Sequence, residues 1–426
     1  MRKMRDSGID WIGTIPQDWQ LSKIGSLYTQ RNEKVSDKDY QPLSVTMQGI
    51  LPQLATAAKT DDGDNRKLVR VGDFAINSRS DRRGSCGISP LDGSVSLINI
   101  ILTPRTAMHP GYYNWLFHTT LFADEFYKWG HGIVADLWTT RWQEMKSITV
   151  PVPEFAEQER IAAFLDAECA EIDTVLEKTR ASIEEYKKLK QAIITQAVTK
   201  GIRGDRPMKN SGIEWIGDIP ESWEVSSVRY IGQLQNGISK GGEFFGKGFP
   251  FVSYGDVYKN YELPHSVSGL IDTTEDERAT YSVEYGDIFF TRTSETIEEV
   301  GFSCVCKRSI PNATFAGFII RLRPFCADEK ILTDYAKYYF RGEHIRAYLV
   351  KEMNLVTRAS LGQTLLKGMS VIVPPKSAQK EIAEYLDDKC ADIDALVAKK
   401  QQYLTEIENY KKSLIYEYVT GKKEVI

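Results

Sequence analysis

The chain has 426 residues, more than one ordinary domain needs, so we expect two to four domains. Hydrophobic residues make up 42% of it and charged residues 26%, a globular composition in which no apolar run approaches the ~18 residues of a membrane-spanning helix. The formal net charge of −4 gives no overall basic character, so composition by itself does not indicate nucleic-acid binding.

The first residues, MRKMRDSGIDWIG, begin with charges and contain no apolar stretch of the kind that a signal peptide needs, so we expect a cytoplasmic protein. The six cysteines and five histidines are scattered and form no CxxC motif. The sequence therefore predicts neither a disulfide framework nor a metal site.

Two stretches of the chain occur twice. Residues 4–19 read MRDSGIDWIGTIPQDW, and residues 208–223 read MKNSGIEWIGDIPESW, with ten of sixteen positions identical. A longer repeat pairs 158–199 with 379–420 without a gap, while the segments between the repeats resemble each other little. This pattern predicts one duplicated scaffold that carries two different recognition segments. The alternative is an old duplication with neutral drift in the inserts.

The first insert, residues 20–150, is predicted to be rich in strands. QPLSVTMQGILPQ, KLVRVGDFAINSR and SVSLINIILTPRT alternate or cluster β-branched residues between turn signals, and GYYNWLFHTTLFADEFYKW has an aromatic, helix-like pattern. The insert carries 15 Lys and Arg against 13 Asp and Glu, so it is not a basic domain. We expect an α+β domain with its own core.

The long repeat is predicted to be helical. Its apolar residues recur every three or four positions, the pattern of a coiled coil, and most other positions hold good helix formers. Gly201 and Gly421 follow the two copies as expected helix ends, and each helix of about 40 residues would be about 60 Å long. The predicted interface residues are Ile161, Leu165, Ile172, Leu176, Ile183, Ile193, Ile382, Leu386, Ile393, Val397, Leu404 and Leu414.

Two such helices in one chain can bury their apolar stripes against each other, most simply in antiparallel orientation. The alternative is that each helix packs on its own globular segment. The second short motif follows the first helix through the Gly-rich joint KGIRGDRP at 200–207. Because the chain ends just after the second helix, we expect its carboxyl end to lie near its amino end, with an approximate two-fold axis.

The second insert, residues 224–370, has the same character, with 17 Lys and Arg against 18 Asp and Glu. FPFVSYGDV, YSVEYGDIFFTRT, GFSCVCKRS and ATFAGFIIRLRP are predicted strands, and LTDYAKYYFRGEHIRAYLV is predicted to be helical. Both inserts place a Gly-Asp turn before a strand, at Gly72-Asp73 and at Gly286-Asp287. The second insert is therefore also expected to be an α+β domain.

A polar loop follows that strand in each insert and is our candidate DNA contact. Arginine with serine or threonine at a strand exit suits phosphates and base edges, because a guanidinium can pair with two acceptors at once, although a merely solvated loop would look similar. The Gly- and Lys-rich stretch 237–242 and two residues beside turn glycines in matching early strands are further candidates. The candidate DNA-binding residues are Gln48, Ser78, Arg79, Ser80, Arg82, Arg83, Lys240, Tyr254, Arg292, Thr293 and Ser294.

Together these features resemble the specificity subunit of Type I restriction–modification enzymes along the whole chain. SGIDWIGTIPQDW and its copy SGIEWIGDIPESW are similar to that family's opening of each target-recognition domain. VPVPEFAEQERIAAFLDAECAEID and its copy VPPKSAQKEIAEYLDDKCADID are similar to the start of its helical region, with Lys380 in place of Glu159 as a minor departure. Recognition domains vary so much in this family that DNA contacts do not transfer by motif, so the candidates above rest on local argument.

The resemblance implies an α+β fold in which two long antiparallel coiled-coil helices separate two target-recognition domains of mixed α/β character, with pseudo-two-fold symmetry. The expected domains are the N-terminal motif with the first target-recognition domain (1–152), the central helix (153–205), the second target-recognition domain (206–373) and the C-terminal helix (374–426).

The resemblance also implies a function. Each target-recognition domain would read one half of a bipartite site in double-stranded DNA. The helices would set the spacer and bind two methylation subunits, and motor–nuclease subunits would complete the restriction enzyme. The chain itself would be non-catalytic and bind no cofactor or metal. S-adenosylmethionine, ATP and Mg²⁺ would be bound by the partner subunits.

Two rival interpretations remain: a coiled-coil scaffold without a role in DNA binding, and a DNA methyltransferase in its own right. An adenine methyltransferase needs a Gly-rich turn and an Asn/Asp-Pro-Pro-aromatic motif. FAGF at 315–318 lacks the further glycine, and the single Pro-Pro, in VPPK, lacks both the amide and the aromatic residue. GGEFFGKG at 241–248 is one residue short of a phosphate-binding loop and ends in Gly248 where a hydroxyl should hold magnesium.

Overall fold

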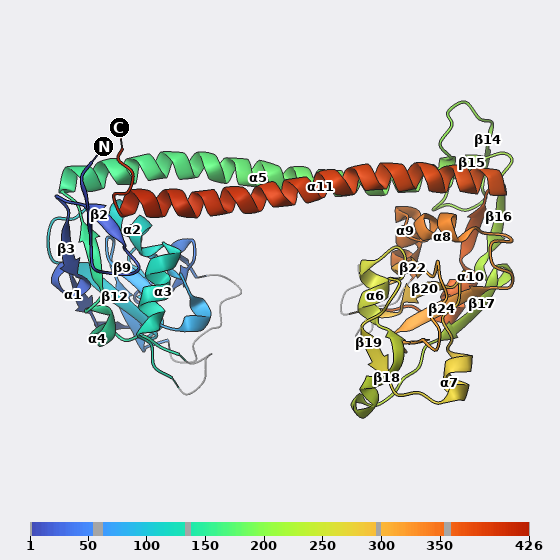
Figure 1. The fold of residues 1–426 in the computed structure, drawn as a ribbon, viewed down its shortest axis with the longest axis horizontal. Helices are drawn as coiled ribbons and strands as arrows, with labels where there is room; N and C mark the ends of the chain where they lie inside the picture. Colours follow the sequence, from blue (N-terminus) through green and yellow to red (C-terminus); the bar gives the residue numbers. More distant parts are fainter. Residues whose placement is uncertain (1, 54–62, 133–137, 295–299, 353–358, 426) are drawn as a thin grey trace. The chain divides into compact units, whose positions relative to one another are not determined.

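The computed structural model describes residues 2–53, 63–132, 138–294, 300–352 and 359–425. The chain divides into two compact units, which we call the first unit (residues 1–180 and 401–426) and the second unit (residues 181–400). Each unit holds one short motif, one variable segment and a part of both long helices (Figure 1). We call the variable segment of each unit its reader.

The first reader is built on a four-stranded antiparallel sheet in the order β10-β9-β12-β4. These strands are β4 (Tyr28–Arg31), β9 (Phe74–Asn77), β10 (Cys86–Ile88) and β12 (Asn99–Pro104). Strands β9 and β12 are buried at nearly every position, because the sheet is covered on both faces. One face packs on the helices α2 (Pro110–Phe117) and α3 (Thr120–Lys128), and the other on smaller strands.

The remaining elements of the first unit are short. They are β1 (Met4–Asp6), β2 (Thr14–Pro16), β3 (Gln20–Lys23), α1 (Ile24–Leu27), β5 (Lys34–Val35), β6 (Leu43–Thr46), β7 (Gly49–Pro52), β8 (Arg66–Val69), the 3-10 helix η1 (Ser80–Arg82), β11 (Gly93–Val95), α4 (Trp142–Met145) and β13 (Thr149–Val152). The short motif forms the β1–β2 hairpin, and β3 pairs with β13 so that the two ends of the reader meet.

The second reader repeats this sheet. In the direction used for the first reader, the equivalent strands have the order β22-β20-β24-β17. They are β17 (Gly232–Asn236), β20 (Ile288–Thr291), β22 (Ser303–Val305) and β24 (Ile319–Pro324). All three pairings are antiparallel, as in the first reader. The two inserts therefore share one scaffold although their sequences differ, and the prediction of α+β readers is confirmed.

The other elements of the second unit complete the same plan. They are β14 (Met208–Asn210), β15 (Asp218–Pro220), β16 (Glu224–Ser227), η3 (Val228–Tyr230), η4 (Gly242–Phe244), β18 (Phe245–Val252), α6 (Tyr254–Lys259), β19 (Gly269–Ile271), α7 (Glu275–Thr280), β21 (Thr293–Ser294), β23 (Thr314–Phe315), α8 (Thr333–Tyr339), α9 (Glu343–Glu352), β25 (Ala359–Ser360), α10 (Gln363–Gly368) and β26 (Ser370–Val373). Strand β16 pairs with β26 as β3 pairs with β13.

The long repeats form α5 (Phe155–Lys200) and α11 (Lys376–Val419), which pack together in antiparallel orientation, as predicted. In the first unit Lys411 of α11 bonds to Asp173 of α5 at 2.6 Å. In the second unit Lys190 of α5 bonds to Asp394 of α11, also at 2.6 Å. These two ion pairs occupy equivalent positions of the repeat, so each helix supplies the lysine once and the aspartate once.

The ends of the long helices also pack into the readers. Ile161, Leu165 and Leu414 lie in the core of the first unit, and Ile382 and Leu386 lie in the core of the second. The alternative that each helix packs on a globular segment is thus correct for the helix ends. Of the predicted interface residues, Ile161, Leu165, Leu176, Ile183, Ile382, Leu386, Ile393 and Leu414 are buried, and Ile172, Ile193, Val397 and Leu404 are half-buried.

Glycines end both long helices in the left-handed conformation, with a φ of 80° at Gly201 and 69° at Gly421, as the sequence predicted. The chain ends then meet in the first unit. The Tyr416 hydroxyl donates to the carbonyl of Ile12 at 2.9 Å, and the Lys422 amine donates to the same carbonyl at 2.6 Å. The prediction that the carboxyl end lies near the amino end is confirmed. Within the described ranges no helix is long and apolar enough to cross a membrane.

Candidate nucleic-acid interface

The two readers hold the exit of their central strand in the same way. In the first reader the carbonyl of Ser78, which follows β9, accepts a hydrogen bond from the backbone N–H of Thr140 at 3.0 Å. In the second the carbonyl of Arg292, which follows β20, accepts from the N–H of Leu361 at 2.7 Å. The candidate loops therefore start from equivalent, fixed points.

Three arginines lie on the first reader's loop. Arg82 and Arg83 expose 68% and 51% of their side chains, and Arg83 pairs with Asp124. Arg79 is half-buried, and its backbone N–H is capped by the Asn77 side chain at 3.0 Å. The loop thus offers two accessible guanidinium groups for phosphate oxygens.

Serines flank Arg79. Ser80 begins η1, and its N–H donates to the Trp138 carbonyl at 3.0 Å. Ser78 is 5% exposed, and its hydroxyl donates to the Ile98 carbonyl at 2.5 Å. Because this hydroxyl is buried and bonded, we remove Ser78 from the candidate contact surface.

The second reader's loop holds three candidates of different kinds. Arg292 is half-buried, and its Nη1 donates to the Gly317 carbonyl at 3.4 Å, which directs the guanidinium toward the turn before β24. Thr293 belongs to β21, which pairs with β25 and so limits the freedom of the loop. Ser294 ends β21, and its side chain lies outside the described atoms.

Lys240, the candidate DNA contact of the Gly- and Lys-rich stretch, is bonded to neighbouring segments of the second reader. Its amine bonds to the Glu277 carboxylate at 2.6 Å and to the Asp272 carbonyl at 2.9 Å, and it lies 4.9 Å from the centroid of the Phe244 ring. The Lys240 bond lowers the pKa of Glu277, so this carboxylate stays ionised and keeps the lysine turned inward. Lys240 therefore stabilises its loop, and we remove it from the contact surface.

We had expected Gln48 and Tyr254 to lie in matching early strands, but neither residue lies in a strand. Gln48 is exposed at the β6–β7 turn. Tyr254 is the first residue of α6, because Ser253 and Asp256 form a capping box that ends the predicted strand and starts a helix. The Tyr254 ring stacks on Tyr258 with centroids 6.0 Å apart.

Residues that the sequence did not single out also gather near Arg292. Asn236, the last residue of β17, accepts a 3.0 Å hydrogen bond from the Gln363 amide at the start of α10. Ser239 is exposed and lies against Gly317, where a Cβ would meet its hydroxyl at 2.1 Å. Amide and hydroxyl groups can read base edges. No sequence signal linked these residues, because Asn236 and Gln363 are 127 positions apart.

Equivalent glutamines attach each reader to its long helix. The Gln158 amide accepts from the N–H of His109 at 2.9 Å and donates to the Pro153 carbonyl at 2.8 Å. The Gln379 amide accepts from the N–H of Leu332 at 2.7 Å and donates to the Pro374 carbonyl at 2.8 Å. Both side chains are buried, so each fixes the loop before α2 or α8 on its helix.

Equivalent aspartates make a second attachment. In the first unit Asp166 accepts from the Trp115 indole at 2.8 Å. In the second Asp387 accepts from the Tyr338 hydroxyl at 2.7 Å and from the buried Lys337. Burial and this bond raise the pKa of Tyr338. The readers are therefore fixed on the helices by polar contacts at matching positions.

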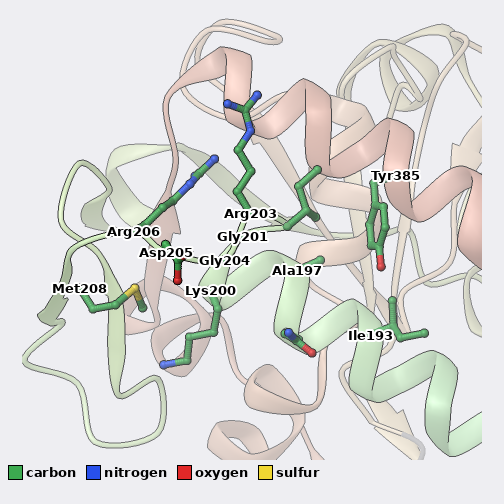
Figure 2. A pocket seen from close by; sticks show the side chains of 12 residues that line it. Ile193, Ala197, Lys200, Gly201, Arg203, Gly204, Asp205, Arg206, Met208 and Tyr385 are labelled. Atoms are coloured by element: carbon green, nitrogen blue, oxygen red, sulfur yellow. The ribbon is translucent and has the colours of Figure 1, made fainter.

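A cavity of about 350 Å³ opens in the second unit where α5 ends (Figure 2). Its wall includes Ala197 and Tyr385. In the first unit the equivalents of these residues are Tyr418 and Phe164, whose rings pack with centroids 4.4 Å apart. The cavity lining contains Lys200, Arg203, Arg206 and one carboxylate, Asp205, but neither histidine nor cysteine. This set resembles no catalytic constellation. Across the described residues we find no group of three potential metal ligands.

The fold and the candidate surface define a class of protein: a duplicated chain with one scaffold, two different sets of strand-exit loops and a pair of long helices. Comparisons with known proteins agree. The family profile "Type I restriction modification DNA specificity domain" matches residues 220–408. The type I restriction enzyme EcoKI specificity subunit of Escherichia coli (strain K12) is 22% identical over 436 residues, covering 96% of this chain and 90% of that protein.

The type I restriction enzyme MjaVIII specificity subunit of Methanocaldococcus jannaschii is 23% identical over 428 residues, covering 96% of this chain and 94% of that protein. The chain is thus similar over nearly its whole length to Type I restriction–modification specificity subunits, and its second half matches their family profile.

Solved structures share the fold. A chain from a structural study of complex assembly and conformational transition in the type I R-M system has a TM-score of 0.73 and 14% identity, covering 96% of this chain and 99% of that chain. The crystal structure of the HsdS subunit from Thermoanaerobacter tengcongensis has a TM-score of 0.50 and 16% identity, covering 96% and 98%.

Proposed function

We propose that this chain is the DNA sequence-specificity subunit of a Type I restriction–modification complex, in which each reader recognises one half of a bipartite site. The observation that carries the proposal is the repeated four-stranded sheet, β10-β9-β12-β4 and β17-β24-β20-β22, with unlike loops at equivalent strand exits. Such an arrangement suits two different half-sites read in one binding event. The family relationship supports the same function.

The long helices are proposed to set the distance between the half-sites and to bind two methylation subunits. The near-neutral charge of both readers fits weak DNA binding by the chain alone, because phosphate neutralisation supplies most non-specific affinity. The methylation subunits would supply the remaining affinity for the DNA duplex, and motor–nuclease subunits would join the complex to cleave DNA.

Catalysis is assigned to these partners. S-adenosylmethionine would be bound by the methylation subunits, and ATP and Mg²⁺ by the motor–nuclease subunits. The chain would contribute binding and orientation of the site. The scaffold and methyltransferase interpretations lose support, since the relatives described above are named as specificity subunits.

The proposal is tested by co-expressing the chain with its methylation subunit and sequencing the methylated bases of the host DNA. We expect one bipartite motif. Exchanging residues 20–150 for the matching segment of a related subunit should then change one half of the motif and leave the other half intact. A change in both halves would contradict independent readers, and methylation without a bipartite motif would contradict the proposed function.

A further inference from the structure

Both readers place an apolar side chain at the same turn, directly before the strand that pairs with the central strand. In the second reader this residue is Phe318, in a turn closed by the bond from the N–H of Ile319 to the carbonyl of Ala316 at 2.9 Å. In the first reader it is Ile98, in a turn closed by the bond from the N–H of Asn99 to the carbonyl of Ser96 at 3.1 Å. We call these the reader turns.

Each reader turn is bonded to the exit of the central strand. The carbonyl of Phe318 accepts from the backbone N–H of Arg292 at 2.9 Å, and the carbonyl of Ile98 accepts from the N–H of Ser78 at 3.4 Å. The second turn is also buttressed on its other side, since a Cβ on Gly317 would meet Ser239 and the Ile238 carbonyl. The backbone of Phe318 is therefore fixed by these contacts, and 63% of the residue is exposed.

Exposure alone does not single out Phe318, because scattered exposed apolar residues are ordinary. Phe325, at the other end of β24, is 70% exposed. The surroundings separate the two rings. Phe318 adjoins Arg292 and Ser239, with the amides of Asn236 and Gln363 at the end of the neighbouring strand β17. The Phe325 end of β24 faces the attachment to α11, where Gln379 bonds to the Lys330 carbonyl.

A guanidinium, two amides, a hydroxyl and a rigid aromatic ring are complementary to the edges of DNA bases. Arginine reads guanine, amides read adenine, and apolar side chains contact the 5-methyl group of thymine. We propose that Phe318 is a specificity-determining residue that makes an apolar contact with a base of the second half-site, and that Ile98 makes the equivalent contact in the first half-site. This inference rests on the proposed function, and it names which side chains of the readers touch bases.

The test uses the complex of the full chain with its methylation subunits and a plasmid library in which each half-site is randomised in turn. Methylated products are sequenced for the wild type, Phe318→Ala, Phe318→Leu and Ile98→Ala. The Phe318→Ala complex should lose about fourfold in preference at one position of the second half-site, the fold-change that one buried methyl group corresponds to. Phe318→Leu should keep part of this preference. Ile98→Ala should relax one position of the first half-site only.

Phe325→Ala is the matched control, because it removes an equally exposed ring roughly 20 Å away along the same strand. It should leave both half-sites unchanged. Thermal unfolding of each variant shows whether the fold is intact, and the Phe318→Leu complex provides a readout if Phe318→Ala unfolds.

Three results would overturn the inference: a folded Phe318→Ala complex with wild-type preference at every position, an equal effect of Phe325→Ala, or relaxation in both half-sites. In each of these cases the wild-type complex still methylates a bipartite site, so the proposed function stands. A wild-type complex without a bipartite site would instead remove the proposed function and this inference together.

Discussion

Single residues distinguish the two halves of this duplicated chain. Trp11 and Trp215 are equivalent residues of the short motifs, but they pack against different side chains, Phe122 in the first unit and His344 in the second. Phe122 packs edge-on against Trp11 with centroids 5.9 Å apart, and His344 stacks on Trp215 at 6.1 Å. His344 is 5% exposed, and neither ring nitrogen has a hydrogen-bond partner in the described part of the chain. An aromatic hydrocarbon ring would therefore suit this site better.

The substitution His344→Phe is expected to make the second unit less sensitive to acid. Burial lowers the pKa of His344 from 6.5 to about 3, so the folded protein keeps the ring neutral while the unfolded chain takes up a proton below pH 6.5. Protonation of His344 therefore does not lower the free energy of unfolding above pH 6.5. Below pH 6.5 the free energy of unfolding falls by up to ~1.4 kcal/mol per pH unit, until the pH reaches about 3. At pH 5 the variant should gain about 2 kcal/mol over its gain at pH 7.5.

Urea unfolding at pH 7.5 and pH 5 measures this difference. His265→Gln, which changes an exposed histidine of the same unit, serves as the control and should keep the wild-type pH dependence. An unchanged pH dependence in His344→Phe would show that this ring is not the source of the acid sensitivity.

The equivalent aspartates Asp166 and Asp387 should differ in importance. Asp387→Ala leaves the buried Lys337 with Glu262 as its one remaining carboxylate partner among the described residues and removes the acceptor of Tyr338, so we expect a loss of about 1–3 kcal/mol. Asp166→Ala removes a single exposed bond to Trp115, and we expect about 0.5–1 kcal/mol. Denaturant unfolding of the full chain compares them, and equal losses would contradict the burial argument.

At the scale of elements, the long helices are proposed to act as a ruler. Ile183 of α5 and Leu404 of α11 lie between two helix–helix contacts, the ion pair of Arg180 with Glu408 in the first unit and the contact of Lys400 with the Tyr186 ring in the second. An insertion at either position alone shifts the register of the apolar seam.

Inserting four residues after both Ile183 and Leu404 should keep the pairing and lengthen the helices by about 6 Å. This is close to two base-pair steps of about 3.4 Å, so the methylated motif should have a longer spacer and unchanged half-sites. Insertion into α5 alone should lower activity through the broken register. Sequencing of methylated sites decides the matter: an active double insertion that retains the original spacer would disprove the ruler.

At the scale of the whole molecule, the meeting of the chain ends permits circular permutation. The hydroxyl of Tyr112 bonds to the carbonyl of Val419 at 2.8 Å in the first unit, and the hydroxyl of Tyr335 bonds to the carbonyl of Val198 at 3.1 Å in the second. Lys422 also donates to the carbonyl of Ile12 in the first short motif, and Lys200 donates to the carbonyl of Asp218 in the second, so each short motif lies beside the end of a long helix.

A permutant that joins residue 426 to residue 1 by a short linker and opens between Arg203 and Asp205 should fold, bind the methylation subunit and modify the same site. The joint is exposed there, so new termini cost few contacts. Co-purification with the methylation subunit and sequencing of methylated DNA provide the measurement. A soluble permutant that fails to bind the partner would show that the native connection at 200–207 is itself part of the docking surface.

The sequence by itself determined the repeated short motif, the two long helices, the strand-rich readers and the resemblance to specificity subunits. Those features depend on local period and composition: apolar residues every three or four positions specify a helix wherever it packs, and Gly201 and Gly421 end the helices for local conformational reasons. The sequence also predicted the antiparallel pairing of the helices, because two matching apolar stripes in one chain are most simply buried against each other in this orientation.

Only the tertiary structure decided which of the candidate side chains are exposed. Ser78 and Lys240 looked accessible in the sequence, yet their partners are the carbonyl of Ile98 and the carboxylate of Glu277, 20 and 37 positions away. Phe318 gained its place in the candidate surface from a backbone bond to Arg292, across a sheet. A side chain's freedom depends on what the fold brings beside it, and contacts between distant segments leave no periodic trace in the sequence.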